Sequence, residues 1–423
     1  MAQANEQQPL TSANAPKGAA LPPHYAWALA LTATFTMSVS YVDRQTLSAL
    51  APTVTKALNI NETQYGFLLS AFSIAYLVGS PLAGRFVDLV GARKGMLGAV
   101  VVWSAVAALH ALVPSFAVLF ALRIALGLAE SPSFPGAAQT VHRALPPQER
   151  ARGLGILFTG SSFGAMVAPK IASYFNEQWG FRYAFLGSAL VGLIWIPVWL
   201  LLAFREPGKS ALDRREEVKK ESVGTGQLLK NAAVWRATIL ILACAPLLGL
   251  HFNWLSKLLE KRFAVTQSQL GNLLIWPPLL FDLGAVIFGT LATRALKRND
   301  DDRPPTNLAL AAAAVAMVGV SIAYTSDPWS TVILAGVSMA GGGGLYALVT
   351  ADLLRRVPPS AVSTAGGMMA AGQSLALIVA NPLIGKWVAA TGSYTPVLVA
   401  LTLIHIPGTL GWVLWRPPAV VRE

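Results

Sequence analysis

The sequence predicts an all-α polytopic membrane protein with twelve transmembrane helices in two six-helix bundles. Three observations predict this fold class. Of the 423 residues, 54% are hydrophobic and 12% are charged, and the mean hydropathy is +0.54, whereas soluble proteins carry about 25% charged residues. The apolar residues form twelve stretches, each near the roughly 20 residues that a membrane-spanning helix needs. One long polar interruption separates the sixth stretch from the seventh.

The twelve predicted spans follow one another along the chain, and each ends at charged residues or at a turn rich in proline and glycine. The N-terminal bundle, residues 23–204, holds spans near 25–51, 63–84, 94–113, 116–141, 151–175 and 180–204. The C-terminal bundle, residues 232–416, holds spans near 233–259, 269–292, 306–324, 329–354, 361–389 and 394–415. Residues 205–231 form a charged cytoplasmic linker. Residues 1–22 are expected to be a disordered cytoplasmic tail, and residues 417–423 a short second tail.

The placement of the basic residues accounts for the net charge of +12 without any nucleic acid partner. With the N-terminus inside, the cytoplasmic connections hold most of them, namely those of the linker and Arg85, Arg93, Lys94, Arg143, Arg150, Arg152, Arg294, Lys297, Arg298, Arg303, Arg355, Arg356 and Arg416. The outer connections hold only Lys56, Arg182, Lys261, Arg262 and Lys386. This asymmetry predicts that both termini lie in the cytoplasm, as in a multi-pass protein of a bacterial-type inner membrane.

The chain contains an internal repeat at an offset of 205 residues. The segment that begins at Gln64 falls on the segment that begins at Gln269, and Gly79 then meets Gly284 without a gap. Two six-span halves in the same orientation are typical of transporters built from parallel repeats, whose site lies near the midplane where the halves meet.

A motif of glycines and charges stands between the second and third spans. Its residues follow a Gly-x-x-x-Asp-x-x-Gly-x-Arg-Lys spacing, formed by Gly84, Asp88, Gly91, Arg93 and Lys94. Glycine at a helix end permits close packing and a left-handed cap, and we expect these residues to act in structure or gating. The spacing resembles the signature loop of the major facilitator superfamily. A weaker copy at residues 289–294 has Thr293 where the first copy has aspartate.

Four further segments look like the anion:cation symporter family of that superfamily. They are Tyr-Val-Asp-Arg-Gln-Thr-Leu-Ser at 41–48, the Arg-to-Pro run at 123–135, Trp-Leu-Ser-Lys at 254–257 and Phe-Asp-Leu-Gly at 281–284. The last two are similar to the hexuronate and galactonate branch. That resemblance implies the uptake of sugar acids coupled to protons.

Eight ionisable residues lie within predicted spans, where each costs at least about 2.5 kcal/mol at the bilayer centre and marks a functional pathway. They are Asp43, Arg44, Arg123, Glu130, Lys170, Lys257, Asp282 and Asp352. Arg44 is the first candidate for a substrate carboxylate, because a guanidinium can donate two parallel hydrogen bonds to it. A structural pair with Asp43 is the alternative. Lys257 occupies the corresponding helix of the second half and could face Arg44 across the cavity, or snorkel to the outer surface.

The other charged residues within the predicted spans are expected to act in proton coupling, helix packing or gating. Glu130 and Asp43 are candidates for proton coupling, because a carboxyl group near mid-bilayer can take up a proton as an anion binds. Arg123 is expected to order spans one and four. Asp282 is expected to pair with Lys257 or to belong to a polar patch, and Asp352 to form a gate or helix-end pair with Arg355 and Arg356. Lys170 is expected to snorkel outward.

Five neutral residues complete the predicted site. The family resemblance places Tyr41, Tyr76, Ser161, Ser162 and Asn381 at the hydroxyl groups of a sugar acid. Contacts between helices are the alternative role for membrane tyrosines and serines.

The sequence therefore predicts a proton-coupled symporter that imports an organic anion, with the lipid bilayer as its environment. We expect a monomer without a metal or cofactor, since the single cysteine, Cys244, allows no internal disulfide or thiol cluster. A short-chain mono- or dicarboxylate or an aromatic acid is the alternative substrate, and a non-transporting receptor is the alternative class. Span five lacks the Gly-Pro-rich pattern of multidrug exporters, and Lys257 stands where an organophosphate antiporter would have a second arginine. No nucleotide loop or nucleophile motif predicts an enzyme.

Overall fold

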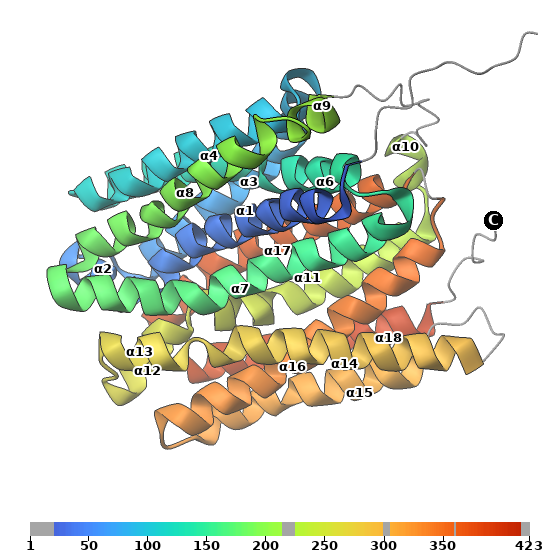
Figure 1. Ribbon diagram of the computed structural model, residues 1–423. Coiled ribbons are helices and arrows are strands. Elements are labelled where there is room, and N and C mark those ends of the chain that lie inside the picture. Colours follow the sequence, from blue (N-terminus) through green and yellow to red (C-terminus); the bar gives the residue numbers. More distant parts are fainter. Residues whose placement is uncertain (1–20, 214–224, 299–304, 359–360, 416–423) are drawn as a thin grey trace, which may run out of the picture.

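The computed structural model describes residues 21–213, 225–298, 305–358 and 361–415, and these residues form helices and connecting turns without strands (Figure 1). The first half contains α1 (Pro23–Ala49), α2 (Ala51–Ala57), α3 (Glu62–Val90), α4 (Ala92–Leu109), η1 (His110–Leu112), α5 (Phe116–Glu130), α6 (Ser133–Ala144), α7 (Pro147–Trp179) and α8 (Phe181–Ala203). The short helices α9 (Gly208–Asp213) and α10 (Thr225–Leu228) follow. The second half contains α11 (Ala232–Asn253), α12 (Leu255–Phe263), α13 (Gln267–Leu273), α14 (Trp276–Arg298), α15 (Thr306–Met317), η2 (Val318–Tyr324), α16 (Pro328–Arg355), α17 (Val362–Thr391) and α18 (Thr395–Leu414). The remaining residues of the predicted tails and linker lie outside the described part of the chain.

The helices confirm the predicted all-α membrane fold. Eleven helical stretches of the described residues are long and apolar enough to cross a membrane. They coincide with every predicted span except the first. Helix α1 has 27 residues and a length of about 40 Å, but its threonines and serines lower its hydropathy. These polar side chains face the protein, since Thr36, Ser38 and Ser40 are buried.

Three predicted spans differ from the helices at their ends. Helix α3 continues past residue 84 to Val90, so the motif between spans two and three is mostly helical, and the break falls at Gly91 with φ 86°. Helix α7 extends over 33 residues, beyond both ends of the predicted 151–175. The first helix of span seven ends at Asn253, and α12 starts at Leu255. Periodicity did not reveal the last break because the sequence stays largely apolar across it.

The internal repeat reappears as equivalent local structure. Asn61 and Gln64 form a capping box at the start of α3, and Thr266 and Gln269 form the same capping box at the start of α13, 205 residues later. The first helix of each half ends in a break followed by a short helix, α2 in one half and α12 in the other. The two halves therefore share their fold in detail.

One of the hydrophobic cores in the described part of the chain joins the two halves, and it lies at one end of the molecule. We call this cluster around Trp254 the seal. Residues from the first half, Leu47, Leu50, Val54, Tyr65 and Leu68, pack there with Leu250, Trp254, Leu255, Leu259 and Leu270 from the second half. Two further cores each belong to one half, with members between Ala26 and Leu212 in one and between Leu228 and Trp412 in the other.

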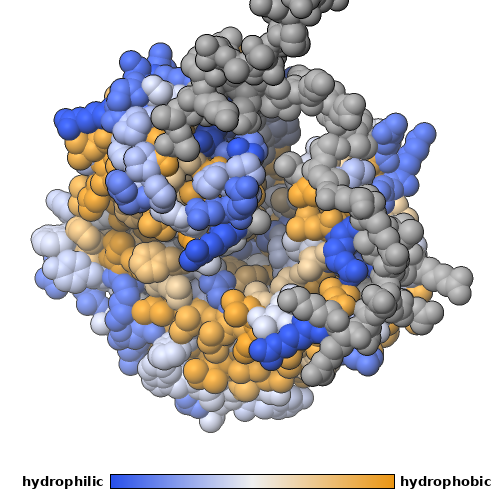
Figure 2. All heavy atoms as spheres, turned by 45° about the vertical axis from the view of Figure 1, so that its right-hand side comes forward, coloured by the Kyte–Doolittle hydropathy of each residue, from blue (hydrophilic) through white to orange (hydrophobic). Residues whose placement is uncertain are grey.

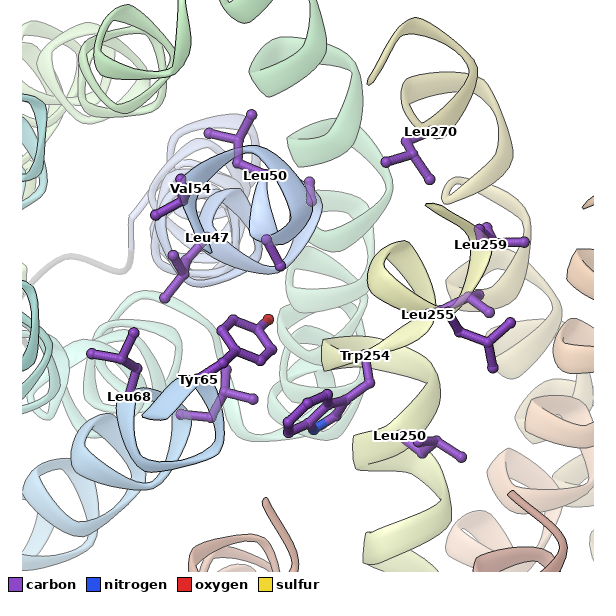
Figure 3. Close-up of a cluster of buried hydrophobic side chains, with 14 of the residues drawn as sticks. Leu47, Leu50, Val54, Tyr65, Leu68, Leu250, Trp254, Leu255, Leu259 and Leu270 are labelled. Carbon is purple, nitrogen blue, oxygen red and sulfur yellow. The ribbon is translucent and has the colours of Figure 1, made fainter. Parts of the chain in front are cut away.

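The opposite end of the molecule is open between the halves. Helices α9 and α10 lie at this end, together with the start of α1 and the end of α18 (Figure 1). Figure 2 brings this end forward and shows the surface hollowed between the two halves. We call this hollow the recess. At the far end, the seal closes the molecule with side chains from both halves (Figure 3).

Backbones approach closely where the halves meet at the sealed end. Helix α3 packs on α17, and α7 packs on α13 and α14. A Cβ atom on Gly66 would clash with the backbone carbonyl of Asn381, and one on Gly385 would clash with the carbonyl of Glu62. Glycine at both positions therefore permits the contact between α3 and α17.

Candidate functional site

The centre of the candidate site is an ion pair between α1 and α5. The Arg44 Nε atom donates a hydrogen bond to the Glu130 Oε2 atom at 2.8 Å, and the Ser40 hydroxyl donates to the same oxygen at 2.7 Å. Ser40 and Arg44 are four residues apart and so share a face of α1. The partner of Arg44 is therefore Glu130, and the alternative pair with the adjacent Asp43 is wrong because neighbouring helical residues point about 100° apart.

Three aromatic rings surround the guanidinium group. The Arg44 Cζ atom lies 4.9 Å from the ring centroid of Tyr41, 4.8 Å from that of Phe72 and 4.4 Å from that of Tyr76. The rings of Phe72 and Tyr76 are stacked 5.9 Å apart. This enclosure holds the charged group by cation–π attraction and leaves 16% of the side chain exposed.

The cluster of charges around this pair has unused hydrogen-bonding capacity. Within the described residues, the buried atoms that lack a hydrogen-bond partner include Arg44 Nη2, Glu130 Oε1, Arg123 Nε and both carboxylate oxygens of Asp43. Asp43, Arg123 and Glu130 are each at most 3% exposed. Buried polar groups in proteins are nearly always hydrogen-bonded. Four such groups in one cluster therefore indicate a site for a ligand, water or protons.

Arg123 joins the cluster through an aromatic ring. Its Cζ atom lies 4.7 Å from the centroid of Phe72, whose ring also contacts Arg44. The cluster contains two arginines and two carboxyl groups, Asp43 and Glu130, so its basic and acidic groups are equal in number. A bound anion would add a negative charge that this cluster does not balance.

Lys257 does not face Arg44, which corrects the prediction of two cations across one cavity. Its Nζ atom lies in the seal, 3.3 Å from Glu62 Oε2, and donates a hydrogen bond to Thr55 at 2.9 Å. Tyr394 donates to the same Glu62 oxygen at 3.2 Å. Lys257 is 7% exposed and therefore does not snorkel to the surface either.

Asn381 also belongs to the seal. Its side-chain oxygen accepts a hydrogen bond of 3.1 Å from the indole nitrogen of Trp254, and the residue is 1% exposed. Its side-chain nitrogen has no hydrogen-bond partner among the described residues, so its predicted contact with substrate stays a prediction. Glu62, which links Lys257 to Tyr394, was missed by the sequence analysis because it stands just before the predicted second span.

Ser162 and Asp282 form a hydrogen bond between the halves. The Ser162 hydroxyl on α7 donates to Asp282 Oδ1 on α14 at 2.7 Å. The predicted pair between Asp282 and Lys257 is wrong, since Lys257 is held in the seal.

Ser161, the neighbour of Ser162, is partly buried on the same helix. Lys170 is exposed, as snorkelling requires, and donates to Asn272.

Two ion-pair groups lie toward the open end. Arg93 donates two hydrogen bonds to Asp213 on α9, at 2.9 and 2.6 Å, and these bonds lower the pKa of the Asp213 carboxyl group. Asp352 accepts from Arg356 at 2.8 Å and from the buried Arg236. The sequence analysis missed Arg236 although it lies inside residues 233–259, where a full search for ionisable residues would find it.

The remaining motif residues are separated. Gly84 lies inside α3, and a Cβ atom at its position would meet open space, so Gly84 does not serve close packing. Gly91 takes the positive φ expected of a glycine cap. Lys94 is exposed. The side chain of Asp88 lies outside the described part of the structure.

Comparisons with known proteins place the chain among transporters. A family model described as the Major Facilitator Superfamily matches residues 33–380. A hexuronate transporter of Escherichia coli K12 is 26% identical over 411 residues, covering 92% of this chain and 93% of its own. A galacturonate transporter of Dickeya chrysanthemi is 26% identical over 266 residues, covering 59% and 76%. The crystal structure of a bacterial homologue of the human lysosomal transporter Spinster, inward-facing and unoccupied, matches with a TM-score of 0.74 and 15% identity, covering 93% and 97%.

Proposed function

The chain belongs to the major facilitator superfamily, and from this premise we propose that it imports an organic anion together with protons. The proposed substrate is a sugar acid such as a hexuronate or galactonate. The observation that carries the proposal is the buried Arg44–Glu130 pair, in which Arg44 Nη2 and Glu130 Oε1 have no hydrogen-bond partner among the described residues. The names of the two bacterial relatives support the choice of substrate class.

Arg44 is the proposed anchor of the substrate carboxylate. Its Nη2 atom is available to donate, while its Nε atom is occupied by Glu130. A bidentate contact on the Nε side of the guanidinium group uses Nε together with an Nη nitrogen. Binding on that side therefore requires Glu130 to release Nε.

Protonation of Glu130 provides that release. A protonated carboxyl group no longer forms the ion pair, and its proton supplies the positive charge that offsets the incoming anion. The cluster then holds Asp43, Arg44, Arg123 and the bound anion without a net charge. A carrier loaded in this way can reorient without moving uncompensated charge through the membrane. Asp43, whose two oxygens have no partner in the described part of the chain, is the proposed second proton site, and a proton there would add one positive charge to the loaded cluster.

The difference between the two ends of the molecule supports alternating access as the proposed mechanism. The seal closes one end with side chains from both halves, and the recess opens the other. We place both termini in the cytoplasm on the basis of the charge asymmetry of the connections. The recess then faces the cytoplasm, and this conformation is the one that releases substrate.

Uptake into proteoliposomes tests the proposal. Labelled glucuronate, galactonate, succinate and benzoate are offered to the full chain with and without an inward proton gradient. We expect accumulation of a sugar acid that the gradient drives. The variant Arg44→Lys keeps the positive charge but removes the planar guanidinium group with its paired donors. It should reduce uptake by about a hundredfold, the equivalent of one lost bidentate contact.

The variant Glu130→Gln separates coupling from binding. It should keep exchange of substrate across the membrane and lose accumulation driven by the gradient. Uptake of succinate or benzoate alone would instead support the alternative substrates. Binding without accumulation of any acid would support a receptor and refute transport.

A further inference from the structure

Asp282 is a carboxylate of the second half that has no ion-pair partner among the described residues. Its hydrogen-bond partner in that part of the chain is the Ser162 hydroxyl of the first half, at 2.7 Å. The side chain is partly buried, and α14 lies against α7 where the two halves meet. Ionisable residues in membrane helices face the protein interior or a water-filled cavity. Asp282 therefore places a carboxyl group without an ion-pair partner among the described residues at the boundary between the halves.

Asp282 lies at about the depth of the Arg44 cluster. A Cβ atom on Gly164 of α7 would lie 2.8 Å from the Tyr41 Cβ atom, and the Tyr41 ring contacts Arg44. Ser162 precedes Gly164 by two residues, a rise of about 3 Å along the helix. Helix α7 therefore contacts Tyr41 and Asp282 at about the same level but through different faces, because Ser162 and Gly164 point about 200° apart.

The seal does not cover this position. A cavity of about 20 Å³ between the halves is lined by Ala165 and Pro169 of α7 and by Pro277 and Pro278 of α14, next to the seal. Ser162 and Asp282 are about one turn from these residues, in the direction of the recess. Asp282 is therefore on the open side of the seal.

We propose that Asp282 is a selectivity residue that accepts hydrogen bonds from hydroxyl groups of the substrate and excludes anions that carry a second carboxylate. The inference rests on the proposed function, since it assumes that Arg44 holds the first carboxylate. The Ser162 hydroxyl donates to Asp282 in the way that a substrate hydroxyl would. A second carboxylate at the same place would meet a like charge a few ångströms away.

The experiment compares a hexuronate with the aldarate of the same carbon chain. Glucuronate has one carboxylate and glucarate has two, and both carry hydroxyl groups. Uptake of each into proteoliposomes is measured for the unaltered chain, for Asp282→Asn, for Asp282→Glu and for Ser162→Ala. The unaltered chain should prefer glucuronate by about a hundredfold, the ratio that two like charges about 4 to 5 Å apart produce in a partly wet site.

Asp282→Asn should reduce that preference to about tenfold or less, because the repulsion disappears while Asn still accepts one hydrogen bond. Asp282→Glu and Ser162→Ala keep the negative charge and should keep the preference. Ser162→Ala is the matched control for loss of the hydrogen bond between the halves. An unchanged preference in Asp282→Asn, within about twofold, would overturn the inference.

A measurement on the unaltered chain covers the case in which Asp282→Asn fails to fold. Glucarate should inhibit glucuronate uptake about a hundredfold more weakly than unlabelled glucuronate does. Equal inhibition would overturn the inference while leaving sugar-acid transport intact. Failure of the proposed function is seen separately, as absence of glucuronate uptake by the unaltered chain.

Discussion

The substitution Trp254→Ala should open the seal. Trp254 is fully buried in the cluster that joins the halves, where its ring lies 4.8 Å from that of Tyr65 in an edge-to-face contact (Figure 3). Tyr65 belongs to the first half and Trp254 to the second, so this contact exists only while the end is closed. The hydrogen bond from Trp254 to Asn381 lies within the second half and survives opening.

The expected shift follows from the area that opening exposes. A tryptophan buries up to about 250 Å², which at about 25 cal/mol per Å² is about 6 kcal/mol. If the contacts across the boundary account for half of that area, their loss weakens the closed state by about 3 kcal/mol. The ratio of closed to open molecules should then fall by about a hundredfold. Trp254→Phe keeps the ring against Tyr65 and should change the ratio by less than about tenfold.

Thiol labelling measures the shift. The only cysteine, Cys244, is first replaced by alanine, and Ala165→Cys is introduced as a reporter. Ala165 is 3% exposed and lines the small cavity beside the seal, so its label rate depends on opening. A polar maleimide should react at least about tenfold faster in the Trp254→Ala protein. A rate within about twofold of the parent, in a protein that unfolds at the same temperature, would refute the assignment of Trp254 to the seal.

Three further predictions concern single interactions. Glu62→Gln removes the ion pair with Lys257 and should raise the same labelling rate by about fivefold, the effect of about 1 kcal/mol for a partly exposed pair. An unchanged labelling rate would show that the ion pair does not stabilise the closed end. Gly91→Ala forces a side chain into a positive φ and should cost about 1–3 kcal/mol, seen as earlier thermal unfolding; Gly84→Ala is the control. Asp213→Asn should lower thermal stability near neutral pH. Because hydrogen bonds from Arg93 lower the pKa of Asp213, that difference should vanish only below about pH 4, and its persistence in acid would contradict the ion pair.

The sequence singled out the charged residues of the candidate site but not their pairing. Arg44 and Glu130 were both selected as candidates from their position in apolar stretches, but nothing in the sequence joins residues 86 positions apart. Their contact depends on how α1 and α5 are rotated about their axes. Lys257 was placed wrongly for a similar reason, because its position depends on how α12 packs against α2 of the other half.

The sequence by itself determined that this chain is a multi-pass helical membrane protein of two related halves. Hydrophobicity and charge are local properties of the chain, and a bilayer forces every long apolar stretch into a helix that satisfies its own backbone. Only the tertiary structure decided which ends of the halves meet, which carboxylate pairs with Arg44 and that Asp282 has no ion-pair partner among the described residues. These outcomes depend on packing between helices distant in sequence, where a rotation of one residue, about 100°, changes every partner.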